Sequence, residues 1–197
     1  MMSQGLETTW KSFFEQYGEL TDHDLERIEA TAKLRNVRKG SHLLSEGEVC
    51  SDFFLVVSGA FRLHYLREGV DTSVWFSFEN NSSIELYSYL SGSPSEYFIE
   101  CIEDGEVLVM AKQQVDSICE SNERIKKLFG MFWQDVVQSL VKRLTDLQKY
   151  SPRERYIRLL EDTDYLNRIP QKYLASYIGV TTTSLSRIKR NLHSKLS

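Results

Sequence analysis

The chain has 197 residues, of which 41% are hydrophobic and 26% are charged, and its formal net charge is −4. This composition is typical of globular proteins and excludes wholesale disorder, and the length suffices for one large domain or two small ones. No apolar run approaches the roughly 20 residues of a membrane-spanning helix, and the first ten residues lack the pattern of a secretory signal, so we expect a cytoplasmic protein with no membrane partner.

The small net charge conceals an asymmetry between the two ends of the chain. Residues 1–120 contain 9 Lys and Arg against 21 Asp and Glu, whereas residues 121–197 contain 15 against 7, giving −12 and +8. No acidic residue follows Asp164. An acidic front and a basic back predict two domains with different partners, the partner of the basic domain being a polyanion.

The first forty residues have helical periodicity. An aromatic face recurs at spacings of three and four, and Gly18 is expected to end this first helix. Thr21, followed by acidic residues, is expected to cap a second helix that runs to Ala32. The apolar face of the first helix consists of Leu6, Trp10, Phe13, Phe14 and Tyr17.

The pattern changes to β between Val37 and about Met110, where short β-rich runs alternate with glycines. Even spacing of this kind predicts a small antiparallel barrel or sandwich. We expect the last two strands to be joined by a turn at Asp104 and Gly105. The predicted strands are 53–57, 60–65, 72–76, 98–102 and 106–110.

Helical periodicity returns from about Ser121 and continues to Lys149. A helix of this length would extend about 42 Å, which exceeds the size of a small β domain. We therefore expect it to form a dimer interface, with a core helix of a single chain as the alternative. The residues assigned to the dimer helix are Phe129, Phe132, Val136, Leu140 and Leu144.

The remaining segment predicts three further helices. Ser151 and Pro152 form a capping signal, and residues 162–168 form a polar loop. A helix from Pro170 to Ile178, a break at 179–181 and a helix over 182–192 then have helix-turn-helix spacing. Small Ala175, flexible Gly179, and Val180, Leu185 and Ile188 as apolar plugs complete the pattern.

The second of these two helices carries hydroxyl groups suited to base edges and cations suited to phosphates. We expect it to bind double-stranded DNA with a strong salt dependence, to which Lys195 would contribute. An ordinary helical hairpin that binds protein, behind a small-molecule-binding β module, is the alternative. The expected DNA-binding residues are Lys172, Thr181, Thr182, Thr183, Ser184, Ser186, Arg187, Lys189 and Arg190.

Taken together, residues 15–192 resemble the Crp/Fnr family of transcription regulators. The resemblance rests on the order of the elements and on an opening motif of Lys39-Gly40, Leu43, Glu46-Gly47, residues 53–56 and residues 58–62. It implies an α+β fold with an N-terminal β-roll (jelly roll) over 1–120, a dimerisation helix over 121–150 and a helix-turn-helix domain over 151–197. It also implies a homodimer on a pseudo-palindromic DNA site, with RNA polymerase as a further partner.

Two departures from the family pattern alter what the resemblance implies. Ile84 replaces the glycine of the cyclic-nucleotide phosphate cassette, and no arginine lies between Arg67 and Arg124, so cyclic AMP is not expected. In the prototype of the family an Arg-Glu pair reads bases, and Thr182 and Thr183 stand in its place here, while Arg187 matches the later arginine of the family. The preferred half-site is therefore expected to differ. The expected effector pocket comprises Glu85, Leu86, Tyr87, Ser95 and Tyr97, whose tyrosines would stack on an apolar or aromatic effector or else form barrel core.

Neither a metal centre nor an enzyme is expected. The three cysteines have no C-x-x-C spacing, and the four histidines are scattered along the chain. No nucleophile and base, and no phosphate-binding glycine loop, occur at recognisable spacings. We therefore expect no cofactor and no catalytic residues.

Overall fold

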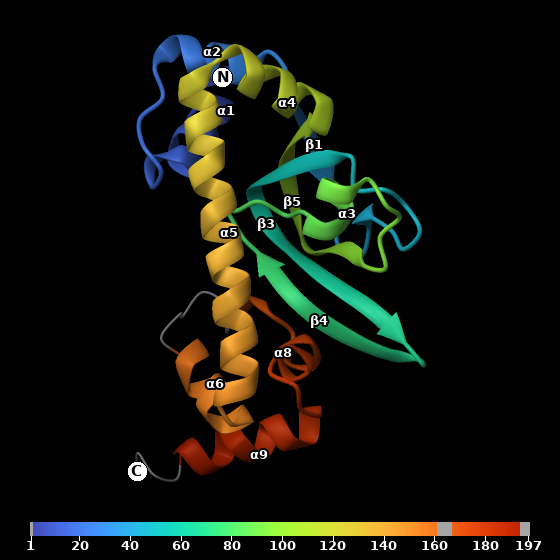
Figure 1. Ribbon diagram of the computed structural model, residues 1–197. Coiled ribbons are helices and arrows are strands. Elements are labelled where there is room, and N and C mark those ends of the chain that lie inside the picture. Colours follow the sequence, from blue (N-terminus) through green and yellow to red (C-terminus); the bar gives the residue numbers. More distant parts are fainter. Residues whose placement is uncertain (1, 161–166, 194–197) are drawn as a thin grey trace.

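The computed structural model describes residues 2–160 and 167–193 (Figure 1). A β domain is followed by one long helix and a small helical domain. In chain order the elements are α1 (Met2–Glu15), α2 (Asp22–Glu29), β1 (Lys33–Val37), β2 (His42–Leu44), β3 (Asp52–Arg67), β4 (Val70–Ser77), α3 (Leu86–Ser91), β5 (Phe98–Ala111), α4 (Lys112–Ser121), α5 (Glu123–Lys149), α6 (Pro152–Leu159), α8 (Gln171–Tyr177) and α9 (Thr182–His193).

The β domain is an antiparallel sheet of five strands in the order β1-β5-β3-β4, with β2 also paired to β5. The antiparallel β region that the sequence predicts is therefore confirmed. The predicted break at Gly59 and the predicted turn at Asp104 and Gly105 are wrong, because β3 and β5 each continue through these residues.

The glycines bend these strands without reversing them. Register shifts occur in the β3–β5 pairing between Val56 and Phe61. A Cβ atom on Gly59 would lie 2.8 Å from the Cα of Gly105, and one on Gly105 would lie 2.1 Å from the carbonyl oxygen of Ser58. Only glycine permits such a close approach, so these residues mark a β-bulge region instead of a hairpin turn.

An aromatic core joins the sheet to α1 and to the first half of α5. Phe129 and Phe132 are buried there, with Phe132 5.2 Å from the ring of Phe13 and Phe129 5.7 Å from that of Phe53. Their assignment to a dimer interface is therefore corrected, because both side chains pack inside their own chain. Periodicity identifies the apolar face of a helix but not what covers it. The side chain of Leu6, the first residue of the predicted apolar face of α1, is not among the side chains that the structure describes.

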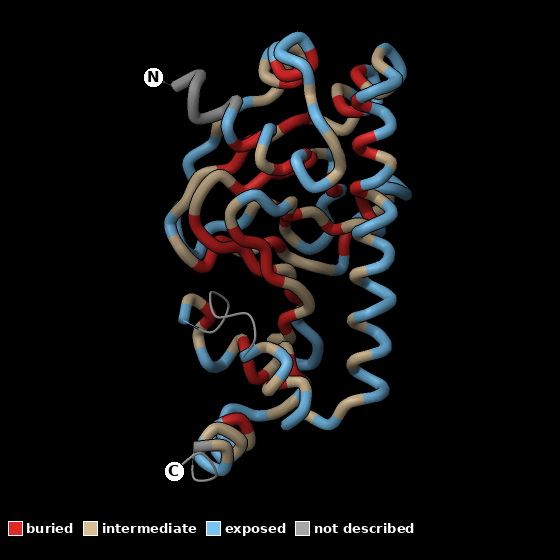
Figure 2. Tube along the Cα trace, turned by 90° about the vertical axis from the view of Figure 1, so that its left-hand side faces the viewer, coloured by how far each residue is buried: buried red, intermediate tan, exposed pale blue. Residues whose placement is uncertain are grey.

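The second half of α5 has an apolar face that the described residues leave open to solvent. Val137, Val141 and Leu144 are 54%, 59% and 57% exposed, and Leu140 is 40% exposed. Figure 2 shows this half of the helix predominantly in the colour of exposed residues. The helix has 27 residues and is capped by Asn122, whose side chain accepts hydrogen bonds from the backbone of Arg124 and Ile125.

Two capping signals from the sequence are present in the structure. Thr21 and Asp24 form a capping box at α2, and Ser151 and Glu154 form another at α6, where Pro152 is the first helical residue. Asp162 and Asp164, which belong to the predicted polar loop and the acidic count, lie outside the described residues. None of the helices within the described ranges is long and apolar enough to cross a membrane.

Candidate DNA-binding surface and effector cavities

The helices α8 and α9 form the helix-turn-helix that the sequence predicts. Leu185 of α9 is fully buried in a cluster with Leu174, Ala175 and Ile178. Gly179 adopts a φ of 76°, the left-handed conformation that ends α8, and the backbone of Val180 donates to the carbonyl of Ala175 at 3.0 Å. The spacing of small, flexible and apolar residues thus fixes how α9 lies on α8.

The outer face of α9 is exposed and polar, and it lies at the end of the molecule away from the sheet (Figure 1). The backbone nitrogen of Ser184 donates to Thr181 Oγ1 at 3.2 Å, so Thr181 serves as a cap, while Lys189 is half-buried with its ammonium 5.8 Å from the Tyr156 ring. The exposed members of the predicted set are Lys172, Thr181, Thr182, Thr183, Ser186, Arg187 and Arg190.

Gln171 belongs to the same face but was not anticipated from the sequence. Its side-chain amide donates to Ser186 Oγ at 2.7 Å and so joins α8 to the exposed face of α9. The sequence feature that could have identified Gln171 as part of this surface is its position beside Lys172 at the start of α8. Lys195, expected to contribute to the salt dependence, lies outside the described residues.

A buried ionic cluster attaches α8 to the β domain. Arg62 is 2% exposed, and its guanidinium donates to Asp71 at 2.8 and 3.0 Å and to Glu100 while it stacks 3.6 Å from the Tyr173 ring of α8. Burial alone would raise the pKa of Asp71, but the hydrogen bonds and charge of Arg62 hold that pKa below its ordinary value. The sequence offered only a hint of this cluster, in that Arg62 is a cation in a cation-poor front.

Further polar contacts join the same two parts of the chain. Ser176 Oγ on α8 accepts from the backbone nitrogen of Ser73 on β4 at 3.1 Å. Arg168 donates to Glu79 and to Glu103 at 2.6 Å each, and these hydrogen bonds hold the pKa of Glu79 below its ordinary value against the cost of burial. The helix-turn-helix is therefore fixed to the sheet by paired charges as well as by an apolar cluster.

A cavity of about 990 Å³, here named the acidic cavity, lies among α1, β4, the segment 80–87, α3 and α5. Four of the five predicted effector residues line it: Glu85, Leu86, Tyr87 and Tyr97. Ser95 is not a lining residue; it is buried, and its Oγ accepts from the backbone nitrogen of Tyr97 at 3.0 Å.

The charge of the acidic cavity does not fit a cyclic phosphate. Glu85, Glu96 and Asp135 contribute carboxylates, and no Lys, Arg or His is among the residues that line it. Glu85 is also committed to the chain, since it accepts from the backbone nitrogens of Tyr87 and Ser88 at 3.0 and 2.8 Å. A phosphate placed here would lose its hydration without gaining a cationic partner.

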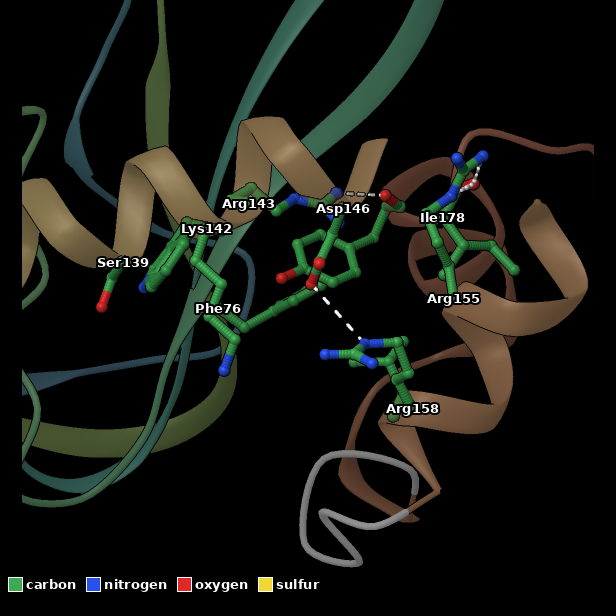
Figure 3. Close-up of a pocket in the computed structure, with 11 residues that line it drawn as sticks. Phe76, Ser139, Lys142, Arg143, Asp146, Arg155, Arg158 and Ile178 are labelled. Atoms are coloured by element: carbon green, nitrogen blue, oxygen red, sulfur yellow. Dashed lines mark hydrogen bonds and ion pairs between the residues drawn. The ribbon is translucent and has the colours of Figure 1, made fainter. Parts of the chain in front are cut away.

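A second cavity, here named the junction cavity, has a volume of about 270 Å³ and lies where α5, α6 and α8 meet β4 (Figure 3). Trp75 and Ser139 line both cavities. The charged residues that line the junction cavity are Lys142, Arg143, Asp146, Arg155 and Arg158. Among all the residues that the structure describes, no group of three or more His, Cys, Asp or Glu side chains is placed to hold a metal ion.

Comparisons with known proteins agree with this architecture. The family model of the cyclic nucleotide-binding domain matches residues 34–122. FixK2 from Bradyrhizobium japonicum is 20% identical, with a TM-score of 0.71 over 83% of this chain and 85% of its own. The c-di-GMP-responsive global regulator CLP from Xanthomonas campestris is 14% identical, with a TM-score of 0.71 over 89% and 93%.

A mutant of CooA from Carboxydothermus hydrogenoformans is 15% identical, with a TM-score of 0.68 over 85% of this chain and 79% of its own. No curated protein sequence matches the chain significantly. The resemblance that the motifs indicate is confirmed at the level of fold: residues 34–122 match the cyclic nucleotide-binding domain, and the chain has the fold of the Crp/Fnr regulators.

Proposed function

We propose that the chain is a sequence-specific DNA-binding transcription regulator that acts as a homodimer in the cytoplasm. The observation that carries the proposal is the exposed face of α9, which presents Thr182, Thr183, Ser186, Arg187 and Arg190 on a helix held by buried Leu185. Hydroxyl and guanidinium groups on a helix that projects from the molecule suit base edges and phosphates in a major groove. The proposal includes no enzymatic reaction.

The apolar outer face of α5 supports the homodimer. Val137, Leu140, Val141 and Leu144 follow helical spacing on one side of the helix and are 40–59% exposed. Pairing this face with a second copy would bury it and would place two α9 helices about one DNA turn apart, roughly 34 Å. A pseudo-palindromic site follows from such two-fold symmetry, and RNA polymerase is a further proposed partner on the family resemblance.

The charge of the acidic cavity favours an effector that carries no negative charge. Its carboxylates and the rings of Tyr87 and Tyr97 favour a neutral or cationic compound with apolar surface over cyclic AMP. A ligand held there would contact both the sheet and α5. It would regulate DNA binding only through a difference in affinity between the two arrangements of the dimer.

DNA binding by α9 is tested with fluorescence anisotropy on labelled duplex DNA from the source genome. Arg187→Ala and Arg190→Ala should each weaken binding about tenfold, because each removes a base or phosphate contact. Lys127→Ala, an exposed lysine on α5 remote from α9, is the matched control and should change little. If both arginine variants bind as tightly as the wild type, α9 is not the reading helix and the alternative, a protein-binding helical domain, is favoured.

A further inference from the structure

The junction cavity concentrates positive charge between the long helix and the helix-turn-helix. Lys142 and Arg143 approach it from α5, and Arg155 and Arg158 approach it from α6, against one carboxylate among the lining residues, Asp146. Trp75 and Tyr177 supply flat aromatic walls. Four cationic side chains and one carboxylate around a cavity of about 270 Å³ give a strongly positive local potential.

Two of these cations are held in place by neutral partners. Arg155 donates to the carbonyl of Ile178 at 2.8 and 3.1 Å (Figure 3). It also donates to the carbonyl of Tyr150 at 2.6 Å. Arg143 donates to the carbonyl of Tyr177 and stacks 3.7 Å from that residue's ring. Carbonyl oxygens and rings fix the guanidinium groups but do not cancel their charge. Burial accordingly lowers the pKa of Arg143, as does the neighbouring Arg155 to a smaller extent.

Arginines elsewhere in the interior have a different arrangement. Arg62 is paired with Asp71 and Glu100, and Arg168 is paired with Glu79 and Glu103. Each of these guanidinium groups therefore has two carboxylates. The protein neutralises partly buried arginines with acidic residues at two places, whereas the junction cavity leaves most of its charge uncompensated.

The one ion pair in the junction cavity is weak. Arg158 approaches Asp146 at 3.8 Å, and its side chain is 44% exposed. Such a long pair on an exposed side chain contributes little and can rearrange around an incoming anion. Lys142 is exposed and also available to turn toward a ligand.

We propose that the junction cavity binds a small phosphate-bearing metabolite with at least two negative charges. Its phosphate would be held by Lys142 and Arg158 in the field of the fixed Arg143 and Arg155, and its organic part would lie against Trp75. Such a ligand bridges α5 and α6 and so fixes the angle between the long helix and the DNA-binding domain. That regulatory consequence rests on the proposed function, whereas anion binding itself does not.

The binding site is tested by calorimetric titration of the full chain with inorganic pyrophosphate in the absence of DNA, at constant ionic strength. Saturable binding of one pyrophosphate per chain is expected. Lys142→Gln and Arg158→Gln should each weaken it about fivefold or more, and Asp146→Asn should strengthen it, because the sign of the charge change decides the effect. Lys149→Gln, on the same helix but not a lining residue, is the control.

The opposite signs of these changes separate ligand binding from a structural role, which would shift all variants in one direction. Thermal unfolding followed by circular dichroism verifies that each variant folds. Absence of saturable binding, or an equal loss in Lys149→Gln, would overturn the proposal. Competition between pyrophosphate and DNA for the site, with a smaller salt dependence of DNA binding in Lys142→Gln, would overturn it in favour of a DNA phosphate contact.

Discussion

The two cavities that meet at Trp75 and Ser139 have opposite charge. The acidic cavity, against the sheet and the first half of α5, has three carboxylates and no cation among its lining residues. The junction cavity, further toward the C-terminal end of α5 and beside the helix-turn-helix, has four cations and one carboxylate. The four cations of the junction cavity all follow residue 120, in the basic part of the sequence, whereas two of the three carboxylates of the acidic cavity, Glu85 and Glu96, belong to the acidic part.

This difference shows how charge is allocated within one fold. In the β domain, the buried cation Arg62 is engaged by Asp71 and Glu100, and it is not among the residues that line the acidic cavity. At the junction cavity, Arg143 and Arg155 have backbone carbonyl oxygens as partners, which leave their positive charge uncompensated. An anion is thus disfavoured where the family fold would hold a cyclic nucleotide and favoured at the domain junction.

The largest expected effect contrasts the two kinds of arginine. Arg62→Met leaves two partly buried carboxylates unpaired and should lower the free energy of unfolding by about 3 kcal/mol. Arg143→Met leaves only a carbonyl without its donor and should cost about 1 kcal/mol. Urea unfolding followed by circular dichroism measures both. Equal losses would show that the paired and unpaired arginines do not differ as described.

The second effect concerns the outer apolar face of α5, of which Leu140 also lines the acidic cavity. Leu140→Glu combined with Leu144→Glu should prevent homodimer formation, because four charges would face one another across the interface. DNA affinity should then fall about 100-fold through loss of two-site binding. Analytical ultracentrifugation and anisotropy measure the two changes, with Lys127→Glu as the exposed control on the same helix. A variant that stays dimeric would contradict the assignment of this face.

A smaller effect is expected from pH, through the cluster around Arg62. Burial, and secondarily the charge of Arg62, lowers the pKa of His64 below 6.5, although Asp71 and Glu100 partly oppose this. In this pH range His64 is protonated in the unfolded chain but stays neutral in the folded chain. The free energy of unfolding should therefore fall as pH decreases from about 7 to about 5.5. His64→Gln should show a shallower fall in this window.

The pH dependence of the free energy of unfolding also separates His64 from the carboxylates. The carboxylates whose pKa values are lowered in the folded state, Asp24, Asp71, Glu79 and Glu154, lose their stabilising contribution only as pH falls below their ordinary values of 3.8 and 4.5. Their contribution should therefore remain in His64→Gln at lower pH. An identical slope for the wild type and His64→Gln between about pH 7 and 5.5 would contradict a neutral buried His64.

The smallest effect is an expected absence of response. Cyclic AMP titrated to about 1 mM should give no saturable signal in calorimetry, because the acidic cavity offers its phosphate no cation. Pyrophosphate under the same conditions should bind at the junction cavity. Saturable cyclic AMP binding that survives Lys142→Gln would place an anion in the acidic cavity and remove the contrast between the two sites.

The sequence predicted the features that depend on local rules. The capping residues Thr21 and Ser151, the length of α5 and the turn at Gly179 follow from backbone hydrogen bonding and conformational preferences that act within a few residues. The helix-turn-helix was recognisable for the same reason. Four of the five expected effector residues also line one cavity, since they lie close together in the chain.

Features that depend on distant contacts were not predictable. Asp104 and Gly105 have turn composition, but the close approach of Gly59 from another strand keeps β5 continuous. Phe129 has the spacing of an interface residue, yet α1 and β3 cover it. The contact of Arg62 with Tyr173 joins residues more than a hundred positions apart, and no local periodicity encodes it.

Whether α9 reads DNA from a two-fold symmetric dimer can be measured by selecting bound duplexes from a random pool with the full chain and sequencing them. We expect an enriched motif with two-fold symmetry and half-sites about 10 base pairs apart from centre to centre. Thr182→Val should change the base preference within each half-site while the spacing stays the same. Recovery of no enriched motif, or of a motif unaffected by Thr182→Val and Arg187→Ala, would contradict the proposal.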